Sequence, residues 1–151
     1  GRDKTDCIYD ENYRFVPGKA HVLADGADVT IAACGIMVPR ALAARELLKA
    51  EGIDAAVLNV ATIKPLDEET ILAYARKTGA IVACEEHSMY GGLGSVISQA
   101  VAKQYPVPVR QVAVQDVFGE SGKPAQLLEK YGLTAEAIVR QAKEAVRMKK
   151  A

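Results

Sequence analysis

The sequence predicts an α/β domain of three layers, in which a mostly parallel sheet of about five strands lies between helices. The first observation is that short apolar runs rich in β-branched residues alternate with amphipathic segments of about 10–15 residues. The second is that glycine or proline separates most of these segments. Alternation of this kind gives a parallel sheet, because each crossover helix returns the chain to the end of the sheet where the next strand begins.

Length, charge and cysteine content limit the class of protein. A chain of 151 residues, 50% of them hydrophobic, fits one domain with a substantial core. The 19 basic and 19 acidic residues balance, which removes the electrostatic case for a nucleic-acid or membrane-surface binder. No apolar run reaches the roughly 18 residues of a spanning helix, and the polar residues 1–16 predict no signal peptide. Three widely spaced cysteines predict reduced thiols, no metal site and a cytoplasmic protein.

Residues 1–18 differ from the rest of the chain, because they are charged, show no sustained periodicity and end at Pro17–Gly18. We interpret them as a linker or an arm. Tyr9, Tyr13 and Phe15 favour an arm that packs against a partner's surface. A simple extension of the sheet edge is the alternative.

The first strand is predicted over Asp28–Cys34, a β-branched run that ends at Gly35. His21–Ala24 precedes it through the tight turn Asp25–Gly26. We therefore expect His21–Ala24 to be an antiparallel edge strand beside this first strand.

A helix is predicted over Pro39–Ala50, with Pro39 at its first position and Gly52 as its stop. Its apolar stripe is predicted to consist of Ala41, Ala44, Leu47 and Leu48. Ala55–Val60 is the next predicted strand.

Asp67 predicts the N-cap of a second helix, because acidic residues follow it and basic residues precede the stop at Gly79. Two further strands are predicted at Ala80–Glu85 and within Val107–Val114. A helix between them is predicted from apolar residues at helical spacing, which are Leu93, Val96, Ile97, Ala100 and Val101.

Two helices close the chain. The first begins at Pro124 and stops at Gly132, and the second is capped by Thr134. The loop Phe118–Pro124 before them is interpreted as an interface, a lid or a plain connection.

Chemistry is expected at the carboxyl ends of the strands, where open α/β sheets form a crevice. The densest polar cluster there runs from Glu85 to Ser95. Its glycine-rich turn predicts an anion-binding site at a helix N-terminus, made by Gly91, Gly92, Gly94 and Ser95. Close packing of strand and helix is the alternative reason for these glycines, since the turn matches neither a P-loop nor a dinucleotide fingerprint.

His87 is the candidate for proton transfer, with a plain hydrogen-bonding role as the alternative. Glu85 and Glu86 are adjacent, so in a strand they point to opposite faces and cannot work as a paired acid and base. We expect one to be inward and hydrogen-bonded and the other solvated. Cys34 and Cys84 are interpreted as inert core residues. The residues hold no complete catalytic set.

An ordered set of segments resembles the C-terminal domain of the transketolase family of thiamine-diphosphate enzymes. The segments are Gly18–Ala20, Asp25–Gly35, Thr62–Asp67, Lys77–Ala80, Glu85–His87, Gly91–Ser95 and Phe118–Gly122. The resemblance implies that residues 19–151 are this domain and that residues 1–18 join it to an upstream domain. It also implies that the whole enzyme transfers two-carbon ketol units between sugar phosphates.

The resemblance implies further that thiamine diphosphate and Mg²⁺ are held by diphosphate-binding and pyrimidine-binding domains, whose motifs this sequence lacks. The C-terminal domain would then support assembly of a homodimer, be inactive by itself and place His87 near the active-site mouth. The loop Phe118–Gly122 is closer to transketolase than to 1-deoxyxylulose-5-phosphate synthase or the 2-oxoacid dehydrogenase beta subunit, which are the alternative enzymes. A non-catalytic assembly or anion-binding module is a further alternative.

Overall fold

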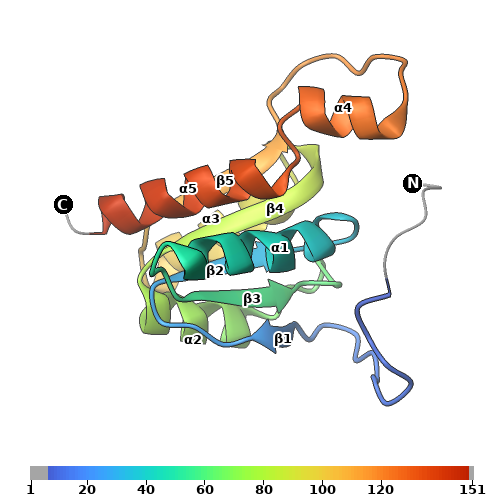
Figure 1. Cartoon of the computed structure of the whole chain (residues 1–151). Coiled ribbons are helices and arrows are strands. Elements are labelled where there is room, and N and C mark those ends of the chain that lie inside the picture. Colours follow the sequence, from blue (N-terminus) through green and yellow to red (C-terminus); the bar gives the residue numbers. More distant parts are fainter. Residues whose placement is uncertain (1–6, 150–151) are drawn as a thin grey trace.

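The computed structural model describes residues 7–149 and has the predicted three-layer α/β/α architecture (Figure 1). The strands are β1 (His21–Ala24), β2 (Val29–Ala33), β3 (Ala55–Asn59), β4 (Ile81–Ser88) and β5 (Val109–Val114). They form one sheet in the order β1-β3-β2-β4-β5. Only the pairing of β1 with β3 is antiparallel. The predicted fold class is therefore confirmed.

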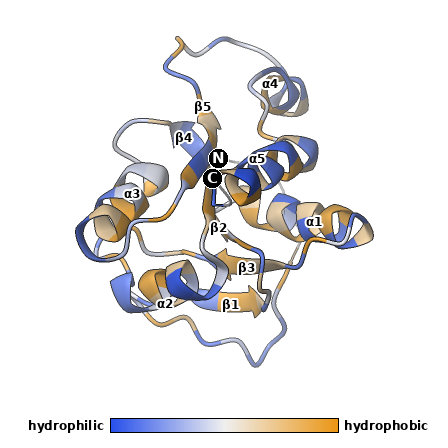
Figure 2. Ribbon diagram, turned by 90° about the vertical axis from the view of Figure 1, so that its left-hand side faces the viewer, coloured by the Kyte–Doolittle hydropathy of each residue, from blue (hydrophilic) through white to orange (hydrophobic). Residues whose placement is uncertain are grey.

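Helices cover both faces of this sheet. They are α1 (Met37–Ala50), α2 (Glu68–Thr78), α3 (Leu93–Gln104), α4 (Pro124–Lys130) and α5 (Ala135–Met148). Figure 2 shows α1 and α5 on one face and α2 and α3 on the other. Each pair of helices encloses a separate hydrophobic cluster against the sheet.

Strand alternation divides the core between the two faces. Ile31 and Ala33 of β2 belong to the cluster under α1 and α5, whereas Ala32 belongs to the cluster under α2 and α3. Successive strand residues point to opposite faces, so a strand covered on both sides must be apolar throughout. All five residues of β2 and all five of β3 are accordingly buried.

Two predicted helix caps are present. The side chain of Asp67 accepts a hydrogen bond from the backbone N–H of Thr70 at the start of α2. The hydroxyl of Thr134 accepts one from the N–H of Ala137 at the start of α5. Each cap satisfies a backbone donor that has no partner within its helix.

The predicted neighbour of His21–Ala24 is wrong, although its antiparallel direction is right. The strand pairs with β3 and not with β2. The reason lies in the connection, where the N–H groups of Ala27 and Asp28 both donate to the carbonyl of Asp54, just before β3. Gly26 lies so close to the β3 backbone that a Cβ would stand 2.4 Å from Ala55. The chain therefore crosses the start of β3 and makes no tight hairpin with β2.

Helix α1 departs from its prediction in two respects. It begins at Met37, so Pro39 is its third residue and not its first. Proline is tolerated there because the first turn of a helix has no internal partner for its N–H groups. Leu47, predicted in the buried stripe, is exposed, since α1 buries only the narrower side that Ala44 and Leu48 occupy.

The described part of the N-terminal segment packs along the edge of the sheet. The rings of Tyr9 and Tyr13 stack with centroids 3.6 Å apart, and the Tyr9 hydroxyl accepts a 2.8 Å hydrogen bond from Asn59. These contacts agree with the edge extension, whereas Phe15 stays exposed. Residues 1–6 of the predicted linker and residues 150–151 of the predicted domain lie outside the described residues. Within residues 7–149, no helix is long and apolar enough to cross a membrane.

Candidate functional site

A crevice of about 330 Å³ opens at the carboxyl ends of β2, β3 and β4. This is the edge of the sheet where the sequence predicted chemistry. The last part of β4 and the segments after the three strands supply its lining, which consists of Cys34, Gly35, Ile36, Ile63, Glu85, Glu86, His87, Gly91 and Gly92.

Glu85 is the innermost charged group of the crevice, with only 1% of its surface exposed. Its two carboxylate oxygens accept the backbone N–H groups of Leu93, at 2.6 Å, and Gly94, at 2.9 Å. These are the first two residues of α3, so the carboxylate lies at the positive end of that helix. The side chain thus acts as an internal anion that caps the helix.

Glu86 also borders the crevice, but it is exposed, as the alternation of a strand allows for the residue after a buried one. The predicted division into one inward and one solvated glutamate is confirmed. Both oxygens of Glu85 are already occupied by backbone N–H groups, so Glu85 and Glu86 do not form a free acid–base pair.

The glycine-rich turn leaves room for the buried carboxylate. A Cβ on Gly92 would stand 1.9 Å from a carboxylate oxygen of Glu85, and a Cβ on Gly94 would stand 2.6 Å from the side chain of Gln111. Close approach therefore explains these two glycines, which favours the packing interpretation of the turn.

Three of the predicted anion-binding groups already have internal partners. The Gly94 N–H donates to Glu85, and the Gly91 N–H donates to the Ser95 hydroxyl, which in turn donates to the carbonyl of Met89. An external anion would have to displace Glu85 or bind beside its charge. The anion site at Gly91, Gly92, Gly94 and Ser95 thus stays a prediction.

His87 lies at the rim of the crevice and is exposed. Its Nδ1 is 3.0 Å from the carbonyl oxygen of Ser88. A carbonyl oxygen only accepts hydrogen bonds, so in this contact Nδ1 is the donor and Nε2 is the nitrogen that can exchange a proton with a ligand. The geometry is compatible with proton transfer, which stays a prediction for this residue.

The cysteines supply no activated nucleophile. Cys34 is half-buried, because it packs against the edge of the cluster under α2 and α3 and also lines the crevice. Burial, together with the charge of Glu85, raises the pKa of the Cys34 thiol to about 11. Burial also raises the pKa of Cys84, which packs on the opposite face of the sheet. Both thiols are therefore protonated near neutral pH.

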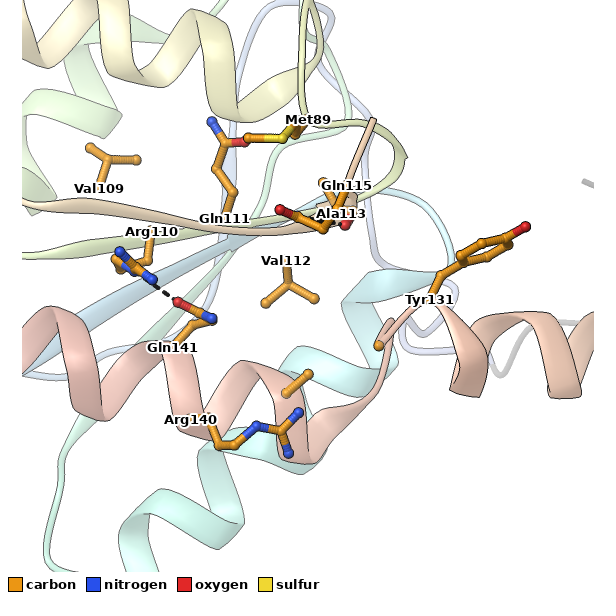
Figure 3. Close-up of a pocket in the computed structure, with 12 residues that line it drawn as sticks. Met89, Val109, Arg110, Gln111, Val112, Ala113, Gln115, Tyr131, Arg140 and Gln141 are labelled. Atoms are coloured by element: carbon orange, nitrogen blue, oxygen red, sulfur yellow. Dashed lines mark hydrogen bonds between the residues drawn. The ribbon is translucent and has the colours of Figure 1, made fainter. Parts of the chain in front are cut away.

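A second cavity of about 540 Å³ lies at the open edge of β5, beside α5 (Figure 3). In it Arg110 donates a 2.8 Å hydrogen bond to the side chain of Gln141, and Arg140 lies nearby on α5. The sequence analysis missed this pocket, because its two arginines are distant in the chain and follow no motif. Its lining contains no carboxylate, histidine or cysteine, so we do not assign it acid–base or nucleophilic chemistry.

Across residues 7–149, no group of three His, Cys, Asp or Glu side chains is placed to hold a metal ion. The crevice offers the exposed imidazole of His87, the exposed carboxylate of Glu86 and the buried, fully hydrogen-bonded carboxylate of Glu85. These groups can position or protonate a ligand, but they do not make up a complete reaction centre.

Comparison with known proteins gives a consistent result. Residues 18–138 match the family described as the transketolase C-terminal domain. A 6-deoxy-6-sulfo-D-fructose transketolase subunit of Clostridium sp. (strain MSTE9) is 52% identical over 142 residues, which are 94% of this chain and 44% of the relative. A 1-deoxy-D-xylulose-5-phosphate synthase of Pelotomaculum thermopropionicum is 43% identical over 139 residues, which are 90% of this chain and 22% of the relative.

The same similarity holds in three dimensions. A solved split-gene transketolase, described as an inactive beta4 tetramer, matches 99% of this chain with a TM-score of 0.95 and 48% identity. The match covers 49% of that protein. The chain thus spans less than half the length of these three relatives.

Proposed function

The chain belongs to the transketolase C-terminal domain family, and we propose that it is the C-terminal domain of an enzyme that transfers two-carbon ketol units between sugar phosphates. The observation that carries this proposal is the 52% identity to a transketolase subunit over 94% of the chain. The 48% identity to a split-gene transketolase supports it. The reaction belongs to the whole enzyme, of which this chain is one part.

The second candidate is the C-terminal domain of a 1-deoxyxylulose-5-phosphate synthase. It is favoured by a relative of that name at 43% identity over 90% of the chain. The two candidates differ in chemistry, because the synthase decarboxylates a 2-oxoacid whereas a transketolase cleaves a ketose. Analysis of the reaction products therefore separates them.

Thiamine diphosphate and Mg²⁺, which the family resemblance implies for the whole enzyme, do not fit the groups of this crevice. The carboxylate of Glu85 fills the helix N-terminus where a diphosphate would find amide donors, and its charge would repel that group. The described residues also hold no cluster of three metal ligands. Both ligands are therefore assigned to diphosphate- and pyrimidine-binding domains outside this chain.

The role left for this chain is assembly of a cytoplasmic homodimer, with His87 as a group at the mouth of the active site. Two hydrophobic clusters provide a rigid support for such a role. His87 is suited to it because it is exposed at the carboxyl ends of the strands, where loops from a neighbouring domain can reach it.

The test uses the native polypeptide that carries residues 1–151, purified with thiamine diphosphate and Mg²⁺. We expect ketol transfer from a ketose phosphate, or from 6-deoxy-6-sulfo-D-fructose, to an aldose phosphate. Decarboxylation of pyruvate onto glyceraldehyde 3-phosphate without ketol transfer would establish the second candidate instead. Tight binding of thiamine diphosphate to residues 1–151 by themselves, measured by calorimetry, would refute the division between domains.

A further inference from the structure

Strand β5 forms one edge of the sheet, and the cavity of about 540 Å³ lies along it (Figure 3). The consecutive residues 109–113 of the strand all line this cavity, together with Gln115 beyond its end. Successive strand residues point their side chains to opposite faces of a sheet. A cavity that residues of both kinds border therefore follows the edge of the strand, and we call it the β5 groove.

The backbone groups of β5 that face the β5 groove follow from the hydrogen bonds on its other side. The carbonyls of Pro108 and Val114 accept backbone hydrogen bonds from the β4 side, at 3.0 and 2.9 Å, so they point toward β4. Backbone groups alternate in direction along a strand. The N–H and C=O groups of the odd-numbered residues of β5 therefore point outward, to the β5 groove.

One of these outward groups already binds an amide. The side-chain Nε2 of Gln115 donates a 2.9 Å hydrogen bond to the carbonyl of Ala113. A further strand would place a backbone N–H at the same position. Gln115 is exposed, so its side chain can move aside when such a strand arrives. The position next to β5 is thus suited to a peptide backbone, and no strand within residues 7–149 fills it.

The two edges of the sheet differ in how they are protected. At the β1 edge, the hydroxyl of Tyr9 lies 3.1 Å from Nδ1 of His21, so the N-terminal segment covers that strand. At the other edge, β5 contains neither lysine nor proline, which commonly prevent a further strand from pairing. Its one charged residue, Arg110, is bonded to Gln141 of α5. An edge without these protections is suited to strand addition.

The β5 groove carries positive charge. Its charged lining residues are Arg110 and Arg140, and its lining contains no carboxylate. Neither guanidinium forms an ion pair in the part of the chain that the structure describes. The 2.8 Å contact with Gln141 orients Arg110 through Nε, which leaves its two terminal nitrogens to a ligand.

The acidic residues nearest along α5 are engaged elsewhere. Glu136, one turn before Arg140, is hydrogen-bonded to Thr134 and to its own backbone N–H at the start of the helix. Glu144, one turn after Arg140, pairs with Arg147. The β5 groove is therefore complementary to an acidic ligand.

We propose that the β5 groove binds an extended acidic peptide of a partner protein, which adds a sixth strand to the five-stranded sheet. Main-chain hydrogen bonds to the outward groups of β5 supply the affinity. Every second side chain of the peptide projects toward α5, where Arg110 and Arg140 select glutamate or aspartate. The proposal does not depend on which reaction the whole enzyme catalyses.

The test uses the native polypeptide that carries residues 1–151 and a fluorescein-labelled peptide of alternating glutamate and valine. A length of about eight residues lets the peptide pair with the whole of β5. We expect fluorescence anisotropy to show saturable binding with a Kd below about 1 mM. A peptide with lysine in place of glutamate should bind at least about tenfold more weakly. So should a peptide N-methylated at every residue, because it keeps the charges but donates no main-chain hydrogen bond.

Two protein variants locate the site. Arg140→Gln should weaken binding of the acidic peptide by about fivefold or more, because it removes a charged donor from the β5 groove. Lys49→Gln is the control, since it removes one positive charge from the exposed side of α1, outside the β5 groove, and should leave binding unchanged. The saturating acidic peptide should also slow hydrogen exchange within residues 109–114.

Absence of saturable binding would overturn the proposal. Equal binding of the lysine peptide would exclude recognition of acidic side chains, and equal binding of the N-methylated peptide would exclude strand addition. Equal effects of Arg140→Gln and Lys49→Gln would place the site elsewhere. Full protection of residues 109–114 without any peptide would also refute it, because another domain or a second copy would then cover the edge.

Discussion

The carboxylate of Glu85 accepts the backbone N–H of Gly94 at 2.9 Å and thereby joins the end of β4 to the beginning of α3. The same carboxylate accepts the N–H of Leu93, so both of its oxygens are satisfied inside the protein. A charge that is only 1% exposed would ordinarily be costly. Two amide donors and the positive end of a helix compensate that cost here.

Replacement of Glu85 by Gln should therefore destabilise the fold. The variant keeps the shape of the side chain but loses the charge and presents an amide NH₂ where a second acceptor is needed. We expect the free energy of unfolding to fall by about 1–3 kcal/mol, measured by urea denaturation of the chain. The matched control is Glu86→Gln, an exposed neighbour, which should change it by less than about 0.5 kcal/mol. Equal effects of the two substitutions would contradict the capping role.

Replacement of Gly92 by Ala should disturb the same contact from the other side. The added Cβ would lie 1.9 Å from a Glu85 oxygen, so the carboxylate must move away from its amide donors. We expect a loss of about 1–3 kcal/mol in thermal or urea unfolding. Gly119→Ala, where a Cβ meets nothing within 4 Å, is the control and should be nearly neutral. When Glu85 is also replaced by Ala, Gly92→Ala should lower the free energy of unfolding by less, because the clashing carboxylate is gone. If the effects of the two substitutions were fully additive in the double variant, the clash would be disproved.

The stability contributed by Asp67 should depend on pH. Burial alone would raise the pKa of Asp67, but hydrogen bonds from the Ala20 N–H and from Thr70 outweigh it and lower the pKa below its ordinary value. A carboxylate whose folded pKa is lowered stabilises the fold above its unfolded pKa and loses that contribution as the pH falls through the folded pKa. Asp67→Ala should thus lower the free energy of unfolding by about 1–2 kcal/mol at pH 7.

Urea unfolding at several pH values tests this prediction. The difference in the free energy of unfolding between the native protein and Asp67→Ala should shrink below about pH 4. Glu69→Ala on the same helix is the control. Glu69 makes a 3.0 Å ion pair with Lys19 at the surface, where such pairs contribute little. A difference for Asp67→Ala that stays constant down to pH 2 would show that the charge of Asp67 is unimportant.

The three cysteines should react with iodoacetamide in a fixed order. Cys7 is exposed, Cys34 is half-buried with a pKa raised to about 11 by burial and by Glu85, and Cys84 is fully buried. Because the thiolate is the reactive form, Cys34 should react slowly at pH 8 and faster with each step up to about pH 11. Cys84 should react only after unfolding. Peptide mapping of the alkylated sites measures the order, and rapid modification of Cys34 at pH 7 would contradict it.

The sequence predicted the central elements well because their signals are local. Strands β2 and β3 were found as apolar runs, and the caps Asp67 and Thr134 were found from the chemistry of helix starts. The inward position of one residue of the Glu85–Glu86 pair followed from strand alternation. Each of these inferences needs only neighbouring residues.

Other features depend on contacts between distant parts of the chain. The pairing of β1 with β3 is decided by Gly26 lying on the β3 backbone, 29 residues further along at Ala55. The exposure of Leu47 depends on how α1 sits on the sheet, and the position of Cys34 in the crevice depends on loops from three strands. Periodicity reports which side of an element is apolar, but it does not report which element covers that side.

The sequence by itself thus determined the α/β class, most of the elements and the edge of the sheet where polar groups gather, because backbone geometry and periodicity are local properties. The tertiary structure decided which group the amides after the glycine-rich turn bind within the protein. The turn looked like an anion site in sequence, and folding brought the carboxylate of Glu85 onto its amides. It also decided which apolar residues remain uncovered, since Phe118 is distinguished from a core phenylalanine only by the absence of a packed neighbour among the described residues.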